Sequence, residues 1–132
     1  MAVDPSRLDA VPLFAGLRAD QLAALAAKFE EREGHVGEHL SSEGGAGYFF
    51  FVIESGKAEV GKHGEIVAEL GPGDFFGEGA IFRARRRTAT VTATEPLALL
   101  AMFGADFAKL VSDIPDLHER IEAALDARLP SD

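Results

Sequence analysis

The chain has 132 residues, of which 47% are apolar and 27% charged, a composition typical of one folded domain with a real core. It contains no cysteine, which excludes a disulfide framework, thiolate catalysis and a zinc site of the cysteine type. The net charge of −9 argues against nucleic acid as a partner, because non-specific affinity for DNA requires many neutralised phosphates.

Residues 5–30 are predicted to be mainly helical. The expected elements are a short helix at about 6–10, a tight turn at 12–17 and a helix at about 19–29. The apolar residues of the longer helix recur at a spacing of three and four: Leu22, Leu25, Ala26 and Phe29. We expect this face to pack on the core. Arg18 occupies the N-cap position, where Ser is expected, and Asp20 in the first turn partly compensates through the helix dipole.

Between Arg32 and Phe103 the pattern changes to short strands separated by glycines, which predicts an all-β barrel or jelly roll. Residues 48–53 form a nearly continuous apolar run, which should be buried on both faces. His63-Gly64 is predicted to be a hairpin turn and Pro72-Gly73-Asp74 a second turn. Two more strands are expected, at residues 87–94 and 96–102.

A glycine-rich turn and an arginine that leads into a strand form the most informative stretch. Gly77 and Gly79 carry no Cβ, so the backbone can approach a ligand closely. One helical turn from Ala80 would point several N–H groups in one direction, and such clusters bind anions. Arg87 can pair with a phosphate through its planar fork of donors, whereas Glu78 would repel phosphate and suits sugar hydroxyls. The stretch therefore predicts a ligand with a phosphate and a vicinal hydroxyl.

The other arginines nearby allow two interpretations. Arg83, Arg85 and Arg86 precede Arg87 within five residues. They either add to a site for one small anion or form a solvated charge run in a loop.

Beyond Phe103 the helical period returns. We expect a short helix at 105–111 and a last helix capped by Ser112 or Asp113, with Pro115 in its first turn. The apolar residues of the last helix step by four along one face: Leu117, Ile121, Leu125 and Leu129.

Several short motifs occur together and in a fixed order. They are Pro12-Leu13-Phe14-x-x-Leu17, Glu43-Gly44-x-x-Gly47, Phe51-Val52-Ile53-x-x-Gly56, Gly73-Asp74-x-x-Gly77-Glu78-x-Ala80 and Arg87-Thr88-Ala89-x-Val91. This series resembles the cyclic nucleotide-binding domain family, which includes regulatory subunits of cyclic-AMP-dependent kinase, nucleotide-gated channels and the bacterial catabolite activator. The resemblance covers roughly residues 12–128.

The resemblance implies a mainly β fold with flanking helices. The expected fold is an eight-stranded antiparallel jelly-roll β-barrel with N-terminal helices and a C-terminal lid helix. Residues 1–132 would form a single domain, with helices at about 5–30, the barrel at about 32–103 and the C-terminal helices at about 104–129.

The same resemblance implies a ligand and its contacts. The phosphate-binding cassette would comprise Gly77, Glu78, Gly79, Ala80, Arg87, Thr88 and Ala89. In it, Glu78 would accept the ribose 2′-hydroxyl, and Arg87 and Thr88 would contact the cyclic phosphate. Thr88 can also touch guanine, so the choice between cyclic AMP and cyclic GMP stays open, with cyclic AMP expected. Gly79 departs from the larger apolar residue usual in the family.

Base and lid contacts are implied as well. Val60, Val67, Ala68 and Leu70 would contact the base and ribose, although ordinary core packing explains each of them equally well. The last helix would close over the base through Leu117, Ile121 and Leu125. Without ligand we expect its apolar stripe to cover a barrel mouth lined by Val60, Val67 and Leu70.

Other classes of function are less well supported. His35 and His39 are spaced by four in a glycine-rich region rather than as the His-x-His pair of a metal-binding jelly roll, so no metal site is expected. No serine lies in a nucleophile turn, and we expect a sensor rather than an enzyme, without a cofactor. A family member that has become a protein-interaction module is the alternative, although the arginine and the glutamate are both present.

Cellular context is indicated only weakly. No apolar run approaches the ~20 residues that span a bilayer. Residues 1–5 lack the pattern of a signal peptide, and we expect a cytoplasmic location. The sequence does not identify a protein effector.

Overall fold

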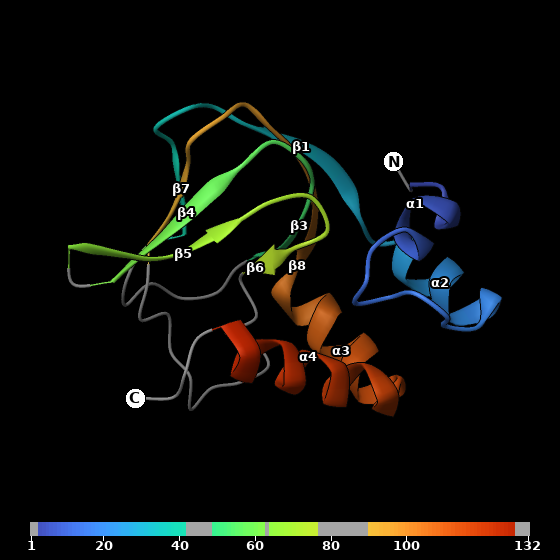
Figure 1. Ribbon diagram of the computed structural model, residues 1–132. Coiled ribbons are helices and arrows are strands. Elements are labelled where there is room, and N and C mark those ends of the chain that lie inside the picture. The colour runs from blue at the N-terminus through green and yellow to red at the C-terminus, as the bar shows by residue number, and fades with distance from the viewer. Residues whose placement is uncertain (1–2, 42–48, 63, 77–89, 129–132) are drawn as a thin grey trace.

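The computed structural model describes residues 3–41, 49–62, 64–76 and 90–128 (Figure 1). The helices in these ranges are α1 (Pro5–Asp9), α2 (Ala19–Ala26), α3 (Gly104–Asp113) and α4 (Pro115–Arg128). The strands are β1 (Glu30–Gly34), β2 (His39–Ser41), β3 (Phe49–Ser55), β4 (Ala58–Lys62), β5 (Glu65–Leu70), β6 (Phe75–Phe76), β7 (Thr90–Ala93) and β8 (Leu97–Phe103). No helix in these ranges is long and apolar enough to cross a membrane.

The described strands form two four-stranded sheets in which every pairing is antiparallel. Sheet A has the order β1-β8-β3-β6, and sheet B has the order β2-β7-β4-β5. Strands early in the chain thus pair with strands late in it, alternately in one sheet and the other, which is the jelly-roll arrangement. The predicted eight-stranded jelly roll is confirmed. No pairing among the described residues joins the two sheets, so these strands form a sandwich rather than a closed barrel.

Two apolar clusters lie on the two faces of sheet A. The inter-sheet core comprises Phe51, Ile53, Ala58, Val60, Leu70, Phe76, Val91, Ala93, Leu97, Leu99 and Ala101. The helical-side core comprises Val3, Leu8, Val11, Leu13, Phe14, Leu17, Leu22, Leu25, Ala26, Phe29, Phe50, Val52, Phe75, Leu100, Met102, Phe107, Val111, Ile114, Leu117 and Ile121. Figure 1 shows the helices gathered on the side of sheet A that faces away from sheet B.

Side chains of β3 alternate between these two cores, as strand geometry requires. Phe50 and Val52 join the helical-side core, whereas Phe51 and Ile53 join the inter-sheet core. The side chains of residues 50–53 are buried on both faces of β3, because the helices cover one face and sheet B covers the other. The prediction that this apolar run is buried on both faces is confirmed for residues 50–53, and Tyr48 lies outside the described residues.

A series of aromatic rings joins sheet A to the helices. Phe50 stacks on Phe107 of α3 with ring centroids 3.7 Å apart. Phe29 lies 6.3 Å from Phe50, and Phe14 lies 6.0 Å from Phe29. Large buried rings contribute much of a core's stability, so this series fixes α3 and the N-terminal turn on the sheet.

The N-terminal helices follow the predicted order with one correction. The turn at 12–17 is confirmed, because the amides of Phe14 and Leu17 each donate to the carbonyl three residues earlier. Helix α2 ends at Ala26, so the prediction that it reaches Phe29 is wrong. Phe29 is fully buried nonetheless, just before β1 begins at Glu30.

The start of α2 is capped in a way that the sequence analysis missed. The Arg18 side chain makes no capping hydrogen bond to the helix. Instead the Gln21 side-chain oxygen accepts a hydrogen bond from the Arg18 backbone N–H at 3.1 Å. This is half of a capping box, and the signal was a Gln three residues after the cap. Arg18 Nε donates to Asp20 Oδ1 at 3.1 Å.

Both predicted turns of the β region occur. Lys62 pairs with Glu65 across the β4–β5 hairpin, and Gly64 has a φ of +81°. His63 lies outside the described residues. In the second turn the Asp74 N–H donates to the Gly71 carbonyl at 3.0 Å, and Gly73 has a φ of +91°. A type II turn requires a positive φ at its third residue, here Gly73, and often has proline second, here Pro72.

The boundary between the last two helices differs from the prediction. Ser112 and Asp113 lie within α3, which continues two residues beyond the expected end. The C-cap is Ile114, whose N–H donates to the Leu110 carbonyl at 2.9 Å. The prediction that Ser112 or Asp113 caps the last helix is therefore wrong. Helix α4 begins at Pro115, as expected from the tolerance of proline at a first helical position.

Candidate functional site

The predicted phosphate-binding residues lie between β6 and β7. Gly77, Glu78, Gly79, Ala80, Arg87, Thr88 and Ala89 are all outside the described residues, so their roles stay predictions. The strands on either side of them belong to different sheets. Phe76 at the end of β6 pairs with Phe51 in sheet A, and Thr90 at the start of β7 pairs with Gly61 in sheet B. The segment therefore connects the two sheets.

Both flanks of this segment are fixed by burial in the inter-sheet core. Phe76 is buried, and its ring stacks on Phe51 with centroids 4.9 Å apart. Val91 is also buried, and it lies opposite Val60. The segment between β6 and β7 is therefore preceded by a buried residue, Phe76, and followed by another, Val91.

The turn before β6 is held by main-chain hydrogen bonds. The Ile53 N–H donates to the Asp74 carbonyl at 2.9 Å, and the Gly73 N–H donates to the Ile53 carbonyl at 2.8 Å. The Asp74 carboxylate also accepts a hydrogen bond from the Gly71 N–H at 2.8 Å. Backbone groups in this turn are therefore well satisfied, and the start of β6 is set by β3.

Three of the four residues predicted to contact base and ribose lie together. Val60 and Leu70 are buried in the inter-sheet core, and Ala68, which packs against this core, lies opposite Val60. Val67 is 45% exposed and does not join them. The β4–β5 register shifts between Val60 and Gly61, where Val60 pairs with Ala68 but Gly61 pairs with Ile66. Ala68 and Leu70 face the inter-sheet core, so strand alternation places Val67 on the opposite face, and Val67 is also the extra residue of this bulge.

The predicted lid residues lie in a different place from the one expected. Leu117 and Ile121 are fully buried in the helical-side core, on the opposite face of sheet A from Val60 and Leu70. The prediction that this stripe covers a mouth lined by Val60, Val67 and Leu70 is therefore wrong for these two residues. The side chain of Leu125 lies outside the described residues.

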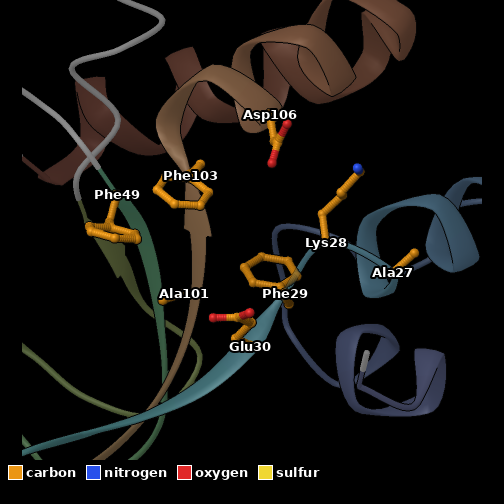
Figure 2. Close-up of a pocket in the computed structure, with 8 residues that line it drawn as sticks. All are labelled: Ala27, Lys28, Phe29, Glu30, Phe49, Ala101, Phe103 and Asp106. Carbon is orange, nitrogen blue, oxygen red and sulfur yellow. The ribbon is translucent and has the colours of Figure 1, made fainter. Parts of the chain in front are cut away.

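A separate pocket of about 210 Å³ lies where β1, β3 and β8 meet α3. Its lining residues are Ala27, Lys28, Phe29, Glu30, Phe49, Ala101, Phe103 and Asp106. Figure 2 shows the rings of Phe49 and Phe103 on one side and Lys28 across from them.

The chemistry of this pocket is aromatic and mixed in charge. The Phe49 and Phe103 rings stack with centroids 5.0 Å apart, and Phe103 is 61% exposed. The Arg32 guanidinium lies 4.7 Å from the Phe49 ring centre, a cation–π contact. None of the predicted ligand-binding residues lines this pocket, and sequence patterns did not indicate it. Phe49 begins β3 and Phe103 ends β8, and in the sequence both look like ordinary buried residues of an apolar strand.

The shifted pKa values of the described residues belong to structural contacts of the N-terminal helices. Glu54 and Glu31 hold the Arg7 pKa above its ordinary value, and Arg7 Nε donates to Glu54 Oε2 at 2.9 Å. The Asp4 pKa is lowered mainly because its carboxylate accepts the Ser6 backbone N–H, which caps α1. Arg18 likewise lowers the Asp20 pKa. These shifts mark a fixed helical segment rather than acid–base chemistry.

The described residues contain no group of three or more His, Cys, Asp or Glu side chains that could hold a metal ion. His35 lies in the loop before β2, and His39 begins that strand. The His35 backbone N–H donates to the Glu38 carboxylate at 2.9 Å. In the described part of the chain, the buried side chains beside β6 and β7 are apolar. The described side chains form no metal centre.

Comparison with known proteins adds to this geometry. The family model of the cyclic nucleotide-binding domain matches residues 31–113. A cAMP-dependent protein kinase regulatory subunit of Yarrowia lipolytica is 34% identical over 101 residues, which are 76% of this chain and 27% of that protein. A cyclic AMP receptor protein of Thermus thermophilus is 30% identical over 123 residues, covering 89% of this chain and 57% of that protein.

The fold is shared as well. The crystal structure of a catabolite activator protein from Thermus thermophilus superposes with a TM-score of 0.74 at 30% identity, covering 89% of this chain and 58% of that one. The chain thus spans between about a quarter and three fifths of the length of these relatives.

Proposed function

Because the chain belongs to the cyclic nucleotide-binding domain family, we propose that it binds cyclic AMP and acts as a sensor without catalysing a reaction. The observation that carries this proposal is the match over residues 31–113, which includes both buried flanks and the whole segment between them. That segment contains Glu78, which suits the ribose hydroxyl of the ligand, and Arg87, which suits its phosphate.

Arg87 provides the phosphate interaction in this proposal. A guanidinium stays charged at physiological pH and can donate two parallel hydrogen bonds to a phosphate. Arg87 lies three residues before Thr90, where β7 begins. Glu78 follows the buried Phe76 by two residues and accepts the ribose 2′-hydroxyl.

The base lies against apolar residues in this proposal. Val60, Ala68 and Leu70 lie together on the side of the inter-sheet core where Val60 pairs with Val91, and the base would pack at this place. Apolar packing discriminates weakly between purines, because it offers no donors or acceptors that read their edges. Thr88 is the candidate for a contact with guanine, and cyclic GMP is therefore the competing ligand.

Calorimetric titration with cyclic AMP, cyclic GMP and the cyclic pyrimidine nucleotides tests the ligand. Arg87→Ala should weaken cyclic AMP binding, because truncating one partner of a buried, hydrogen-bonded charge pair costs roughly 2–5 kcal/mol. At ~1.4 kcal/mol per decade that is about 30-fold to several thousand-fold. Arg18→Ala is the matched control, since this arginine is 73% exposed and pairs with Asp20. Equal affinities of Arg87→Ala and wild type would overturn the assignment of Arg87.

A 2′-deoxy cyclic nucleotide tests Glu78. It should bind wild type more weakly than the ribonucleotide does, and Glu78→Ala should remove this difference. A mutant that still discriminates would place another group on the ribose. Thr88→Ala separates the two purines: a selective loss of cyclic GMP affinity places Thr88 on guanine, and an equal loss for both places it on the phosphate.

The sensor part of the proposal is tested by the fate of the ligand. Nucleotide recovered after prolonged incubation with the protein should be chemically unchanged, and conversion to the 5′-monophosphate would indicate an enzyme. If no cyclic nucleotide binds at all, the chain is a protein-interaction module of this family instead. We also propose that nucleotide binding moves the C-terminal helix and so signals to a protein effector that is not yet identified. The proposed location is the cytoplasm.

A further inference from the structure

The pocket between β1, β3, β8 and α3 is lined by none of the predicted ligand-binding residues and has a chemistry of its own. It measures about 210 Å³, and we call it the aromatic pocket. An apolar cavity of about 150 Å³ is large enough to hold benzene. The aromatic pocket therefore has room for a six-membered ring together with a few further atoms.

One wall of the aromatic pocket is an exposed ring. Phe103 ends β8, is mostly exposed, and belongs to neither of the two apolar cores of the described residues. Among those residues its ring contacts one other ring, that of Phe49, with centroids 5.0 Å apart. Phe49 is covered further by the Arg32 guanidinium, 4.7 Å from its ring centre. Phe103 therefore presents an uncovered aromatic surface, on which a second ring can stack.

Strand geometry explains why this surface lies outside the core. Phe51 pairs with Ala101, and two residues along the same strands Phe49 pairs with Phe103, so all four side chains lie on one face of sheet A. Phe51 and Ala101 are buried in the inter-sheet core, and Phe49 packs against it while partly exposed. The two rings thus continue the inner face of sheet A beyond the end of that core.

Three charged side chains line the same pocket without an ion pair. Lys28 lies between α2 and β1, Glu30 begins β1, and Asp106 lies in the first turn of α3. Within the described part of the chain, none of these three side chains forms a hydrogen bond or an ion pair. Nearby, Arg18 pairs with Asp20 even though both are exposed.

Stabilisation of the helix explains only one of these charges. A carboxylate in a first turn interacts favourably with the helix dipole, which accounts for Asp106. Lys28 and Glu30 lie outside any helix and have no such role. Figure 2 shows Lys28 across the pocket from Phe103, with Asp106 and Glu30 on its other sides. Charges of both signs therefore face the space beside an uncovered ring.

We propose that the aromatic pocket binds a small zwitterion that carries a flat apolar group, the chemistry of a free aromatic amino acid. The ligand's carboxylate pairs with Lys28, its ammonium pairs with the carboxylates of Asp106 and Glu30, and its ring stacks on Phe103. A ligand with a single charge leaves either the lysine or the carboxylates unpaired, whereas a zwitterion satisfies both signs. The site is separate from the proposed cyclic nucleotide site.

Titration of isotope-labelled protein with L-phenylalanine, followed by amide chemical shifts, tests the site. Because the pocket is open and its ion pairs are screened by water, we expect a Kd of roughly 1 mM. The amides of Glu30, Phe103 and Asp106 should shift, and that of Glu69 in sheet B should not. Absence of any shift at the first three residues at the solubility limit of phenylalanine would overturn the inference.

Three analogues each remove one feature of the ligand. L-Alanine lacks the ring, L-phenylalanine amide lacks the carboxylate, and N-acetyl-L-phenylalanine lacks the ammonium. Each should bind about threefold more weakly than phenylalanine, as expected for the loss of one exposed ion pair or ring contact. Equal binding of the amide or the N-acetyl compound would overturn the zwitterion and point instead to one end of a peptide.

Matched variants assign each ligand group to its side chain. Lys28→Gln should weaken binding of phenylalanine about threefold without weakening that of its amide. Asp106→Asn combined with Glu30→Gln should weaken binding of phenylalanine without weakening that of the N-acetyl compound. Lys109→Gln is the control, since this lysine of α3 is 79% exposed and lies outside the pocket lining. A loss in Lys109→Gln as large as that in Lys28→Gln would overturn the inference.

Phe103→Ala tests the ring contact, and the exposure of Phe103 leads us to expect a folded variant. Its affinity for phenylalanine should fall to that for alanine, and an affinity equal to that of wild type would overturn the inference. Saturating cyclic AMP should not displace phenylalanine, whereas displacement would place both ligands in one site and overturn it as well. Absence of cyclic AMP binding would overturn the proposed function and leave the phenylalanine titration decisive for this pocket.

Discussion

Replacement of Gly56 by alanine should destabilise the fold more than the same replacement at other turn glycines. Gly56 lies between β3 and β4 with a φ of +91°, and a Cβ there would lie 2.2 Å from the Pro96 carbonyl oxygen. The clash is with backbone, so no side-chain rotation relieves it. The neighbouring turn is also held in place, because the amides of Thr94 and Glu95 donate to the Lys57 carbonyl at 2.9 and 3.2 Å.

The magnitude has two parts. A positive φ costs an L-residue roughly 1–2 kcal/mol relative to glycine. Forcing an extra methyl into a packed site adds about 1–3 kcal/mol. Gly56→Ala should therefore lower the free energy of unfolding by about 2–5 kcal/mol. Gly64→Ala is the matched control, since Gly64 has a φ of +81° and nothing within 4 Å of its Cβ position, so only the first part applies.

Urea denaturation followed by circular dichroism measures both variants. The expected order of midpoints is wild type, then Gly64→Ala, then Gly56→Ala, with similar slopes if the transition stays two-state. Gly73→Ala should lie between the two variants, because its Cβ would meet a proline ring at 3.1 Å rather than backbone. Equal losses for Gly56→Ala and Gly64→Ala would refute the reasoning, since the clash would then contribute nothing.

Three further outcomes follow from the same structure. Phe107→Ala removes a fully buried ring stacked on Phe50 and should cost about 3–5 kcal/mol in urea denaturation, far more than Phe103→Ala at an exposed ring. Because the Asp4 pKa is lowered from its ordinary value of 3.8, the stability it contributes is present above that value and is lost as pH falls through the lower folded pKa. Melting temperatures of Asp4→Asn should therefore fall less than those of wild type on acidification, and parallel curves would contradict this. Cyclic AMP at 100 times its Kd should stabilise wild type by about 2.7 kcal/mol in thermal unfolding, whereas Arg87→Ala at the same concentration should gain far less.

Local chemistry explains what the sequence could predict. The strand run at 50–53, the hairpin at Gly64 and the turn at Pro72-Gly73-Asp74 each depend on periodicity or on backbone preferences of a few neighbouring residues. The ordered motifs then indicated the family, and the family implied the jelly roll. The cassette residues were likewise found from their order in the chain, and their contacts with a ligand await the binding experiments.

Placement of those elements against one another depended on tertiary structure. The spacing of Leu117 and Ile121 showed that they share a face but not which face of sheet A they bury, because periodicity reports burial and not the partner. Val67 reads like any strand valine, and only the register with β4 shows that it lies in a bulge. Arg120 contacts main-chain carbonyls more than a hundred residues away in sequence, and any residue type can provide such a carbonyl. The sequence by itself thus indicated most of the elements, their order and a candidate ligand motif, whereas packing decided which core holds α4 and what ties it to the N-terminal turn.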